Sequence, residues 1–358
     1  MKQRALLCLI IVVCFGCANK THLKLNDIQV IGSHNSYKIG IEKPLLNYIV
    51  AIDSSKAKSL EYEHISIKEQ LNLGLRNLEL DVFYDPKGGH FSNPKGLEIV
   101  KQSGAIPMPY DEDNTLEASG FKLFHIQDID FRSHHLLFKD CLSVMKQWSD
   151  ENPTHTPIII LMNTKDKALP QLTKPLPFSV KAYQELDAEI RSVFSKDDLI
   201  VPDDVRKDFN NLEEAVLKNG WPKLEDCKGK FLFVLDEKEQ KNKLYINGDN
   251  TLKNRVFFVN SKEGNPEAAF RIVNNPITDF EYIKQLVAKG YMVRTRADAG
   301  TKEARTNDYT KFEKAKASGA QVISTDYYKP STLFKSDFEV KFDDGTYERI
   351  KKAAEYND

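Results

Sequence analysis

The chain is poor in the features that assign a sequence to a special class. Glycine and proline are not enriched, no repeat or low-complexity segment occurs, and the net charge is only −1 over 358 residues. This balance leaves no basic footprint for nucleic acid and no acidic tail, so we expect no nucleic-acid partner. With 41% hydrophobic and 10% aromatic residues, the chain can bury the core of one large barrel or of two ordinary domains.

Cysteine is also scarce, and no apolar run is long enough to span a bilayer. Lys2 and Arg4 precede an apolar run over residues 5–15, which is typical of a signal peptide. The pattern predicts a lipoprotein-type signal over residues 1–16, with Cys17 as the lipid-bearing first mature residue. An outer-membrane or cell-surface lipoprotein is then expected. Simple cleavage, giving a periplasmic or secreted protein, is the alternative.

Only Cys141 and Cys227 remain beyond residue 17. They could pair in an oxidising compartment, but the sequence does not tell whether the two thiols lie within reach of each other.

Apolar runs alternate with helical patterns along the rest of the chain. The runs end near His34, Asp81, His125, Asn163, Asp236, Asn260, Arg294 and Ser324. Helical patterns cover residues 136–148, 180–194, 212–218, 280–289 and 309–318. This alternation predicts an α/β fold, a closed (β/α)8 barrel of the TIM type over residues 22–334. An open doubly wound sheet would also alternate, but no glycine-rich phosphate loop follows the first run. Residues 335–358 are expected to pack on the barrel as an extension.

The chain is organised around residues 74–83, where polar and apolar side chains alternate as on a strand with two unlike faces. Glu79 and Asp81 therefore point the same way, about 7 Å apart. Two carboxylates on one face repel each other unless a cation, a proton or an arginine lies between them. His34 and His125 end two other runs, so all four side chains are expected at the carboxyl ends of the strands, where such barrels hold their active sites.

These residue types suit the cleavage of a phosphodiester. One imidazole can take a proton from the attacking oxygen while the other gives a proton to the departing oxygen. Glu79, Asp81 and the amide oxygen of Asn35 form a hard oxygen cluster suited to Ca²⁺ or Mg²⁺ rather than to zinc. A divalent cation there could bind the phosphate and activate the nucleophile.

An ordered set of motifs resembles the calcium-dependent phosphoinositide-specific phospholipase C family, and most of all its bacterial and fungal single-domain branch. The resemblance spans about residues 28–328. Its motifs are Gly32-Ser33-His34-Asn35-Ser36-Tyr37, Gly74-x-Arg76-x-x-Glu79-x-Asp81, His125, Lys165-Asp166, Arg294-Thr295-Arg296-Ala297-Asp298 and Ser324-Thr325-Asp326-Tyr327.

The resemblance implies a distorted barrel that cleaves inositol phospholipids at a membrane surface to diacylglycerol and a cyclic inositol phosphate. His34 and His125 become the catalytic histidines by this resemblance, and Asn35, Glu79 and Asp81 become ligands of Ca²⁺, with Mg²⁺ the less expected metal. Arg76, Lys165 and Arg296 are the expected substrate-binding side chains, with a role for Arg76 in fixing the carboxylates from behind as the alternative. We expect a monomer.

The chain departs from this family after the fourth apolar run, where Asn163 stands in place of a glutamate ligand. The amide still offers an oxygen, so Asn163 is kept in the expected metal set, but one negative charge is lost. Either the site binds calcium weakly until the substrate phosphate joins, or another acid such as Asp128 helps.

Two other functions stay open from the sequence. One is a glycerophosphodiester phosphodiesterase, and the other is a lipid-anchored protein that binds a phosphorylated sugar without turnover.

Overall fold

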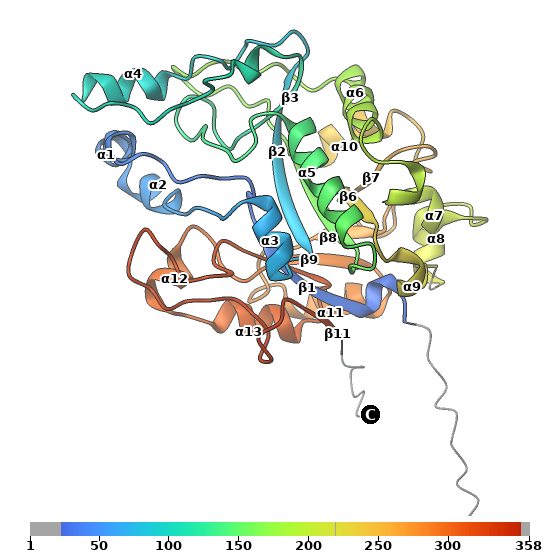
Figure 1. Cartoon of the computed structure of the whole chain (residues 1–358). Coiled ribbons are helices and arrows are strands. Elements are labelled where there is room, and N and C mark those ends of the chain that lie inside the picture. The colour runs from blue at the N-terminus through green and yellow to red at the C-terminus, as the bar shows by residue number, and fades with distance from the viewer. Residues whose placement is uncertain (1–22, 219, 352–358) are drawn as a thin grey trace, which may run out of the picture.

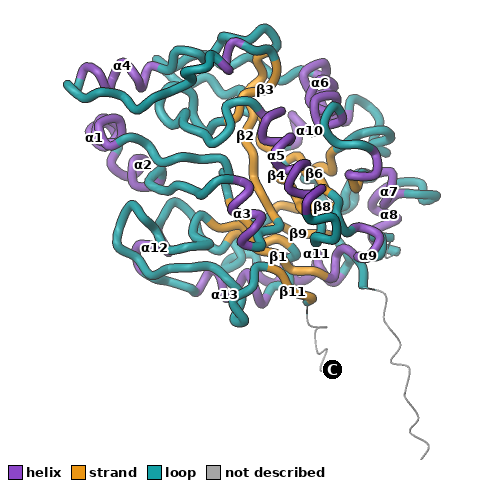
Figure 2. The backbone as a smooth tube through the Cα atoms, viewed as in Figure 1, coloured by secondary structure: helices purple, strands orange, loops and turns teal. Residues whose placement is uncertain are grey.

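The structure is a computed structural model that describes residues 23–218 and 220–351. Helices surround a curled, mostly parallel sheet, and long loops extend on one side (Figures 1 and 2). The expected signal sequence and Cys17 lie outside the described residues. No helix among those described is long and apolar enough to cross a membrane.

The strands are short and most are buried along their whole length. They are β1 (Ile28–Ser33), β2 (Asn77–Asp85), β3 (Gly120–Leu123), β4 (Ile158–Thr164), β5 (Leu199–Ile200), β6 (Phe231–Leu235), β7 (Phe257–Val259), β8 (Phe270–Ile272), β9 (Met292–Arg296), β10 (Val322–Thr325) and β11 (Glu348–Ile350).

A helix forms at each of the predicted helical patterns, and further helices lie in both halves of the chain. They are α1 (Lys43–Ile52), α2 (Ser54–Ser59), α3 (Ile67–Leu73), α4 (Lys95–Gln102), α5 (Phe138–Glu151), α6 (Val180–Arg191), α7 (Pro202–Arg206), α8 (Leu212–Leu217), α9 (Leu224–Cys227), α10 (Glu239–Ile246), α11 (Phe280–Ala288), α12 (Lys302–Thr306) and α13 (Thr310–Ala317). Short 3₁₀ turns cover Leu25–Asp27, Thr115–Glu117 and Lys196–Asp198.

Parallel pairing joins β6, β4, β2, β1, β10, β9 and β8 in that order, and β7 pairs with the far end of β6. A single parallel bridge between Asn260 and Phe270 connects β7 to β8 and brings the ends of the curled sheet together. The predicted α/β barrel architecture is therefore confirmed, in a distorted form.

One predicted barrel strand is wrong. The run that ends at His125 forms β3, which pairs antiparallel with β2, Val82 lying opposite Leu123, while β2 pairs directly with β4. β8, which the sequence did not indicate, takes a place in the ring instead. A strand as short as β3 carries no signal of its direction, because either direction buries the same side chains.

The alternation in β2 sets its two faces. Leu78, Leu80 and Val82 are fully buried in the same apolar cluster as the inner face of α5. Glu79 lies on the opposite face, inside the curled sheet, where it reaches Arg294 of β9 on the far side. Burying both faces of a strand is usual in a parallel sheet that helices cover.

Glycine at position 32 brings the first two strands close together. A Cβ atom there would lie 2.0 Å from the backbone oxygen of Asn77, so no larger residue fits without moving a strand. This close approach places His34 beside the polar face of β2.

The C-terminal segment packs against the first strand. β11 pairs antiparallel with β1, and Phe338 and Phe342 are buried in a cluster with Tyr327 and Phe312. Cys141 and Cys227 are both free and buried.

We predict that Phe338→Ala lowers the free energy of unfolding by about 3–5 kcal/mol, because a fully buried aromatic ring is removed and leaves a cavity. Urea unfolding followed by circular dichroism measures the change. Ile277→Ala, at a position that is 49% exposed, is the control and should stay within about 0.5 kcal/mol of the parent chain. An unchanged midpoint for Phe338→Ala would show that this segment does not stabilise the barrel.

Candidate active site

A cleft of about 610 Å³ lies where the strands end at their carboxyl side. It is lined by His34, Glu79, Asn163, Asp236, Glu237, Lys238, Gln240, Lys241, Asn260, Ile272, Asn274, Arg294 and Arg296. These residues come from strands, from the loops that follow them and from α10, far apart in the sequence, so the fold assembles the cleft. Predicted site residues from β1, β2, β4 and β9 meet here.

His34 directly follows β1 and is fixed on several sides. Its backbone N–H donates to the carbonyl of Thr325 at 3.0 Å, and its own carbonyl accepts from His64 Nε2 at 2.7 Å. Its Nδ1 lies 2.8 Å from Oδ1 of Asp326, a carboxylate that also accepts from Arg296 at 3.2 Å. The pKa of Asp326 is held well below its usual value, because His34 and Arg296 outweigh the effect of burial.

His125 follows β3 and has a matching support. Its Nδ1 lies 2.7 Å from Oδ2 of Asp130, and Asp130 Oδ1 lies 3.1 Å from the buried Nζ of Lys38. Burial lowers the pKa of His125, while Asp130 opposes that shift. The pKa of Asp130 is also lowered, because Lys38 and His125 outweigh its burial.

The two histidines therefore share one arrangement: a ring nitrogen on a buried carboxylate, and a cation behind that carboxylate. A partner on Nδ1 fixes the ring and leaves Nε2 for the chemistry. His34 Nε2 lies 3.6 Å from Oε1 of Glu79, and His125 lies within electrostatic reach of Asp81 and Lys165. Glu79 and Asp81 are neighbours on one face of β2, so the two rings lie beside successive acids of one strand, and the His34 ring lines the cleft.

The four residues expected to bind calcium also lie at this end of the barrel, but their acids already face cations. Glu79 Oε2 accepts from Arg294 at 2.6 Å, and Asp81 Oδ2 lies 2.9 Å from Lys165 Nζ. Asn163 donates to the other oxygen of Glu79 at 3.1 Å. In the described part of the chain, no three His, Cys, Asp or Glu side chains are placed to hold a metal ion.

Calcium requires six to eight oxygen ligands, and its affinity depends on their negative charge. Asn35 is buried in a left-handed turn with φ of 50°, and its amide nitrogen contacts the Tyr62 hydroxyl at 2.6 Å. Two acids neutralised by two cations, with two neutral amides, do not fit a calcium ion in this arrangement.

Two of the three expected substrate-binding residues reach the site. Arg296 lines the cleft, and Lys165 lies beside Asp81. Arg76 is wrong for this role: it precedes β2 at the opposite end of the strand, where it donates to the carbonyls of Leu71 and Leu75 and contacts Glu348 at 3.4 Å. An arginine that stands one residue before the start of a nine-residue strand cannot reach the other end of that strand.

Asp128, the extra acid considered for the metal, has a structural role instead. Its carboxylate accepts from the backbone N–H of Lys95 at 3.0 Å and from the Thr173 hydroxyl at 3.1 Å. It thereby starts α4 and ties two loops together, as an N-terminal capping acid does.

Sequence reasoning missed Asp130, Asp326 and Arg294 as members of the site. Two of them stand inside quoted motifs, and Asp130 lies five residues after His125, yet only the fold shows which atoms they contact. Burial raises the pKa of Asp298, and the neighbouring Asp326 raises it further. The Asp298 carboxylate accepts a hydrogen bond from the backbone N–H of Asp326 at 3.1 Å. This second acid orients the one that supports His34.

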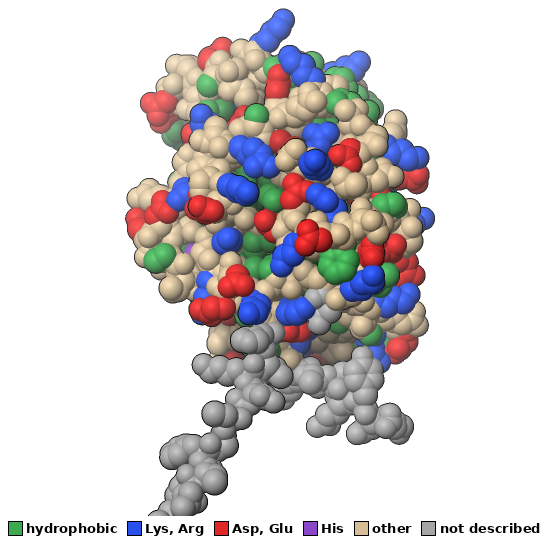
Figure 3. Space-filling view, turned by 90° about the vertical axis from the view of Figure 1, so that its right-hand side faces the viewer, with side chains coloured by type: hydrophobic (Ala, Val, Ile, Leu, Met, Phe, Trp, Pro, Cys, Tyr) green, Lys and Arg blue, Asp and Glu red, His purple; other side chains and the backbone are tan. Residues whose placement is uncertain are grey.

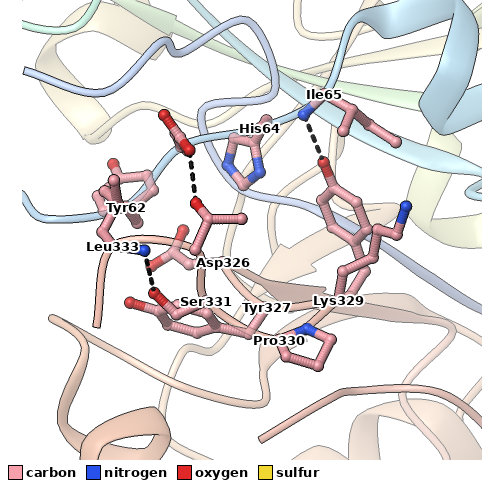
Figure 4. Close-up of a pocket in the computed structure, with 12 residues that line it drawn as sticks. Tyr62, His64, Ile65, Asp326, Tyr327, Lys329, Pro330, Ser331 and Leu333 are labelled. Atoms are coloured by element: carbon pink, nitrogen blue, oxygen red, sulfur yellow. Dashed lines mark hydrogen bonds between the residues drawn. The ribbon is translucent and has the colours of Figure 1, made fainter. Parts of the chain in front are cut away.

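A second cavity of about 250 Å³ lies behind His34 and shares Asp326 and Tyr62 with its support (Figure 4). His64 and Tyr328 stack on its wall with ring centres 5.4 Å apart. Burial lowers the pKa of His64 to about 4, so this ring is neutral and acts as a support for the His34 loop.

The family model described as "Phosphoinositide phospholipase C, Ca2+-dependent" matches residues 23–351. The chain belongs to this family. Among curated protein sequences, none matches the chain.

Solved structures of phospholipases C show the same fold. A calcium-dependent phosphoinositol-specific phospholipase C from Pseudomonas sp. has 15% identity and a TM-score of 0.56, with 92% of this chain and 95% of that chain covered. The calcium-dependent phosphatidylinositol-specific enzyme from Streptomyces antibioticus has 18% identity and a TM-score of 0.53, with 88% and 99% covered. The predicted family is confirmed, and it is a family of phosphodiester-cleaving enzymes.

We predict that Asp130→Asn lowers the pKa of His125 further, because the carboxylate that raises it is removed while burial still lowers it. The titration of the His125 ring protons by NMR measures this shift, and the parent chain should titrate below about 6.5. The His34 ring, whose carboxylate is unchanged, is the internal control. A His125 pKa that rises in the variant would contradict the proposed support.

Proposed function

We propose that this phospholipase C cleaves phosphatidylinositol-type lipids to diacylglycerol and an inositol phosphate that is first cyclic. The observation that carries the proposal is the pair of imidazoles, each on a buried aspartate, at the carboxyl end of a barrel of this family.

The chemistry needs one neutral and one protonated ring. The inositol 2-hydroxyl oxygen attacks phosphorus while its proton passes to one imidazole Nε2. The bond from phosphorus to the diacylglycerol oxygen breaks, and the other imidazole gives that oxygen a proton. Water can open the cyclic product by the reverse exchange of protons. Arg296, and Lys165 beside Asp81, lie where they can balance the charge of the phosphate.

Calcium is the cofactor that the family description implies. Its ligands would be Asn35, Glu79, Asp81 and Asn163. As a Lewis acid it would stabilise the negative charge of the phosphate. Because Glu79 and Asp81 are paired with Arg294 and Lys165, the proposed proton transfers and the attack on phosphorus use no metal ion.

We predict that His34→Ala and His125→Ala each lower turnover of phosphatidylinositol by about 10²–10⁴-fold, since each removes one proton transfer. Phosphorus NMR of the reaction follows the cyclic phosphate. His90→Ala changes an exposed histidine that contacts the Lys174 carbonyl, and it is the matched control. This variant should fold like the parent chain and cleave phosphatidylinositol at the same rate.

The same reaction with glycerophosphocholine separates the alternatives. Choline-glycerol cleavage without inositol lipid cleavage would favour a glycerophosphodiester phosphodiesterase. If neither substrate is cleaved, with or without calcium, the result would favour a protein that binds its ligand without turnover.

A lipid substrate requires contact with a membrane surface, and one part of the molecule suits it. The apolar outgrowth, α1 with residues 103–110, extends from the strand ends of β1 and β2 (Figure 1). Ile52 is 69% exposed and Ile106 is 93% exposed, while Leu45 and Val100 beneath them are buried in a shared cluster. By contrast, the face at the right of Figure 1 carries acidic and basic side chains interspersed (Figure 3).

We propose that this outgrowth touches the lipid, and that export with a lipid anchor on Cys17 keeps the barrel near a membrane. Exposed large apolar side chains near a site mark such contacts.

We predict that the double variant Ile52→Ser and Ile106→Ser lowers the rate on phosphatidylinositol vesicles about tenfold, because apolar area is lost from the lipid contact. Its rate on a soluble inositol phosphodiester should stay unchanged. Leu217→Ser, at another exposed apolar position, is the control for vesicles. Equal losses on both substrates would contradict a membrane contact.

A further inference from the structure

The charges at the proposed metal position differ from those that a calcium site needs. Glu79 and Asp81 supply two negative charges, and Arg294 and Lys165 lie on them at 2.6 and 2.9 Å. Asn163 adds no charge and donates its N–H to Glu79 at 3.1 Å. A divalent cation entering here would meet two fixed positive charges, and each of the two acids of β2 already faces one of them.

We propose that this chain cleaves its substrate without a divalent cation, and that Lys165 and Arg294 supply the positive charge in its place. The inference rests on the proposed function for its substrate class. Arg294 neutralises Glu79, and Lys165 is the cation that contacts the phosphate.

Arg294 is held in place on several sides. The residue is 1% exposed in β9, and its guanidinium donates both to Glu79 and to the side chain of Asn274. An arginine stays protonated in a protein, so the charge on Glu79 is permanently balanced. Arg294 therefore takes up one oxygen of this acid, and Asn163 donates to the other.

Lys165 differs from Arg294 in its exposure. Its side chain is 30% exposed, it follows β4, and its charge acts on His125. A lysine is a point charge on a flexible stem and a common phosphate ligand. Its ammonium has three N–H donors, so it can contact a phosphate oxygen while it stays beside the buried Asp81 carboxylate.

The first test measures calcium on the parent chain. Isothermal titration with CaCl₂ should detect no binding up to millimolar calcium, and EGTA should change the rate of phosphatidylinositol cleavage by less than twofold. Calcium binding in the titration, or a rate that EGTA abolishes and calcium restores, would overturn the inference and leave the proposed function standing. Loss of all cleavage under every condition would instead remove the proposed function, and the titration would still decide on the metal.

The second test restores the missing acid. Asn163→Glu adds a third carboxylate beside Glu79, so this variant should bind calcium in the titration, and EGTA should lower its rate at least tenfold relative to calcium buffer. A variant that binds no calcium although it folds like the parent chain would show that the missing charge is not what excludes the metal.

The third test addresses Lys165. Lys165→Met keeps the stem and removes the charge, so the affinity for inorganic phosphate should fall at least tenfold and the cleavage rate at least 100-fold, with or without calcium. Lys165→Arg should recover part of both. Lys146→Met, which changes a lysine on α5 that pairs with Asp198 at 3.5 Å, is the control. Unchanged phosphate affinity in Lys165→Met would overturn the role of Lys165.

Discussion

The site depends on a contact between an imidazole Nδ1 and a buried carboxylate, and this contact occurs twice. Asp326 holds His34, and Asp130 holds His125, at 2.8 and 2.7 Å. A buried carboxylate is costly unless it is paired, and Arg296 and Lys38 provide the pairing. The ring orientation, the position of the free Nε2 and the stability of the buried acids are thus consequences of one interaction.

The distorted barrel brings these two units together from distant parts of the chain. Asp326 follows β10, the neighbour of β1, so it meets His34 through strand pairing. Asp130 lies in the loop just after His125, and β3 returns antiparallel along β2. The second histidine therefore follows a strand that returns along β2, rather than a parallel strand of the barrel.

Much of the site could be predicted because strand ends are visible in the sequence. His34, Glu79 and Asp81 each end or interrupt an apolar pattern, and a parallel barrel collects such positions at one end. The motif of Arg76 suggests that it lies near the acids, but its position one residue before β2 places it at the opposite end of the strand.

The pairings could not be predicted, since they depend on register and on contacts across the barrel. Glu79 meets Arg294, a residue 215 positions away, only because β2 and β9 face each other inside the curled sheet. The direction of β3 could not be read either, because its four residues have no sided pattern. For the same reason the sequence suggested an open acidic cluster where the structure has balanced ion pairs.

The measurement that tests the central claim most directly is a crystal structure of the chain with inositol 1,2-cyclic phosphate. The account predicts that the phosphate lies in the cleft, within about 3 Å of Nε2 of both His34 and His125. A phosphate bound in the cavity beside Tyr328, or one that contacts neither imidazole, would contradict it.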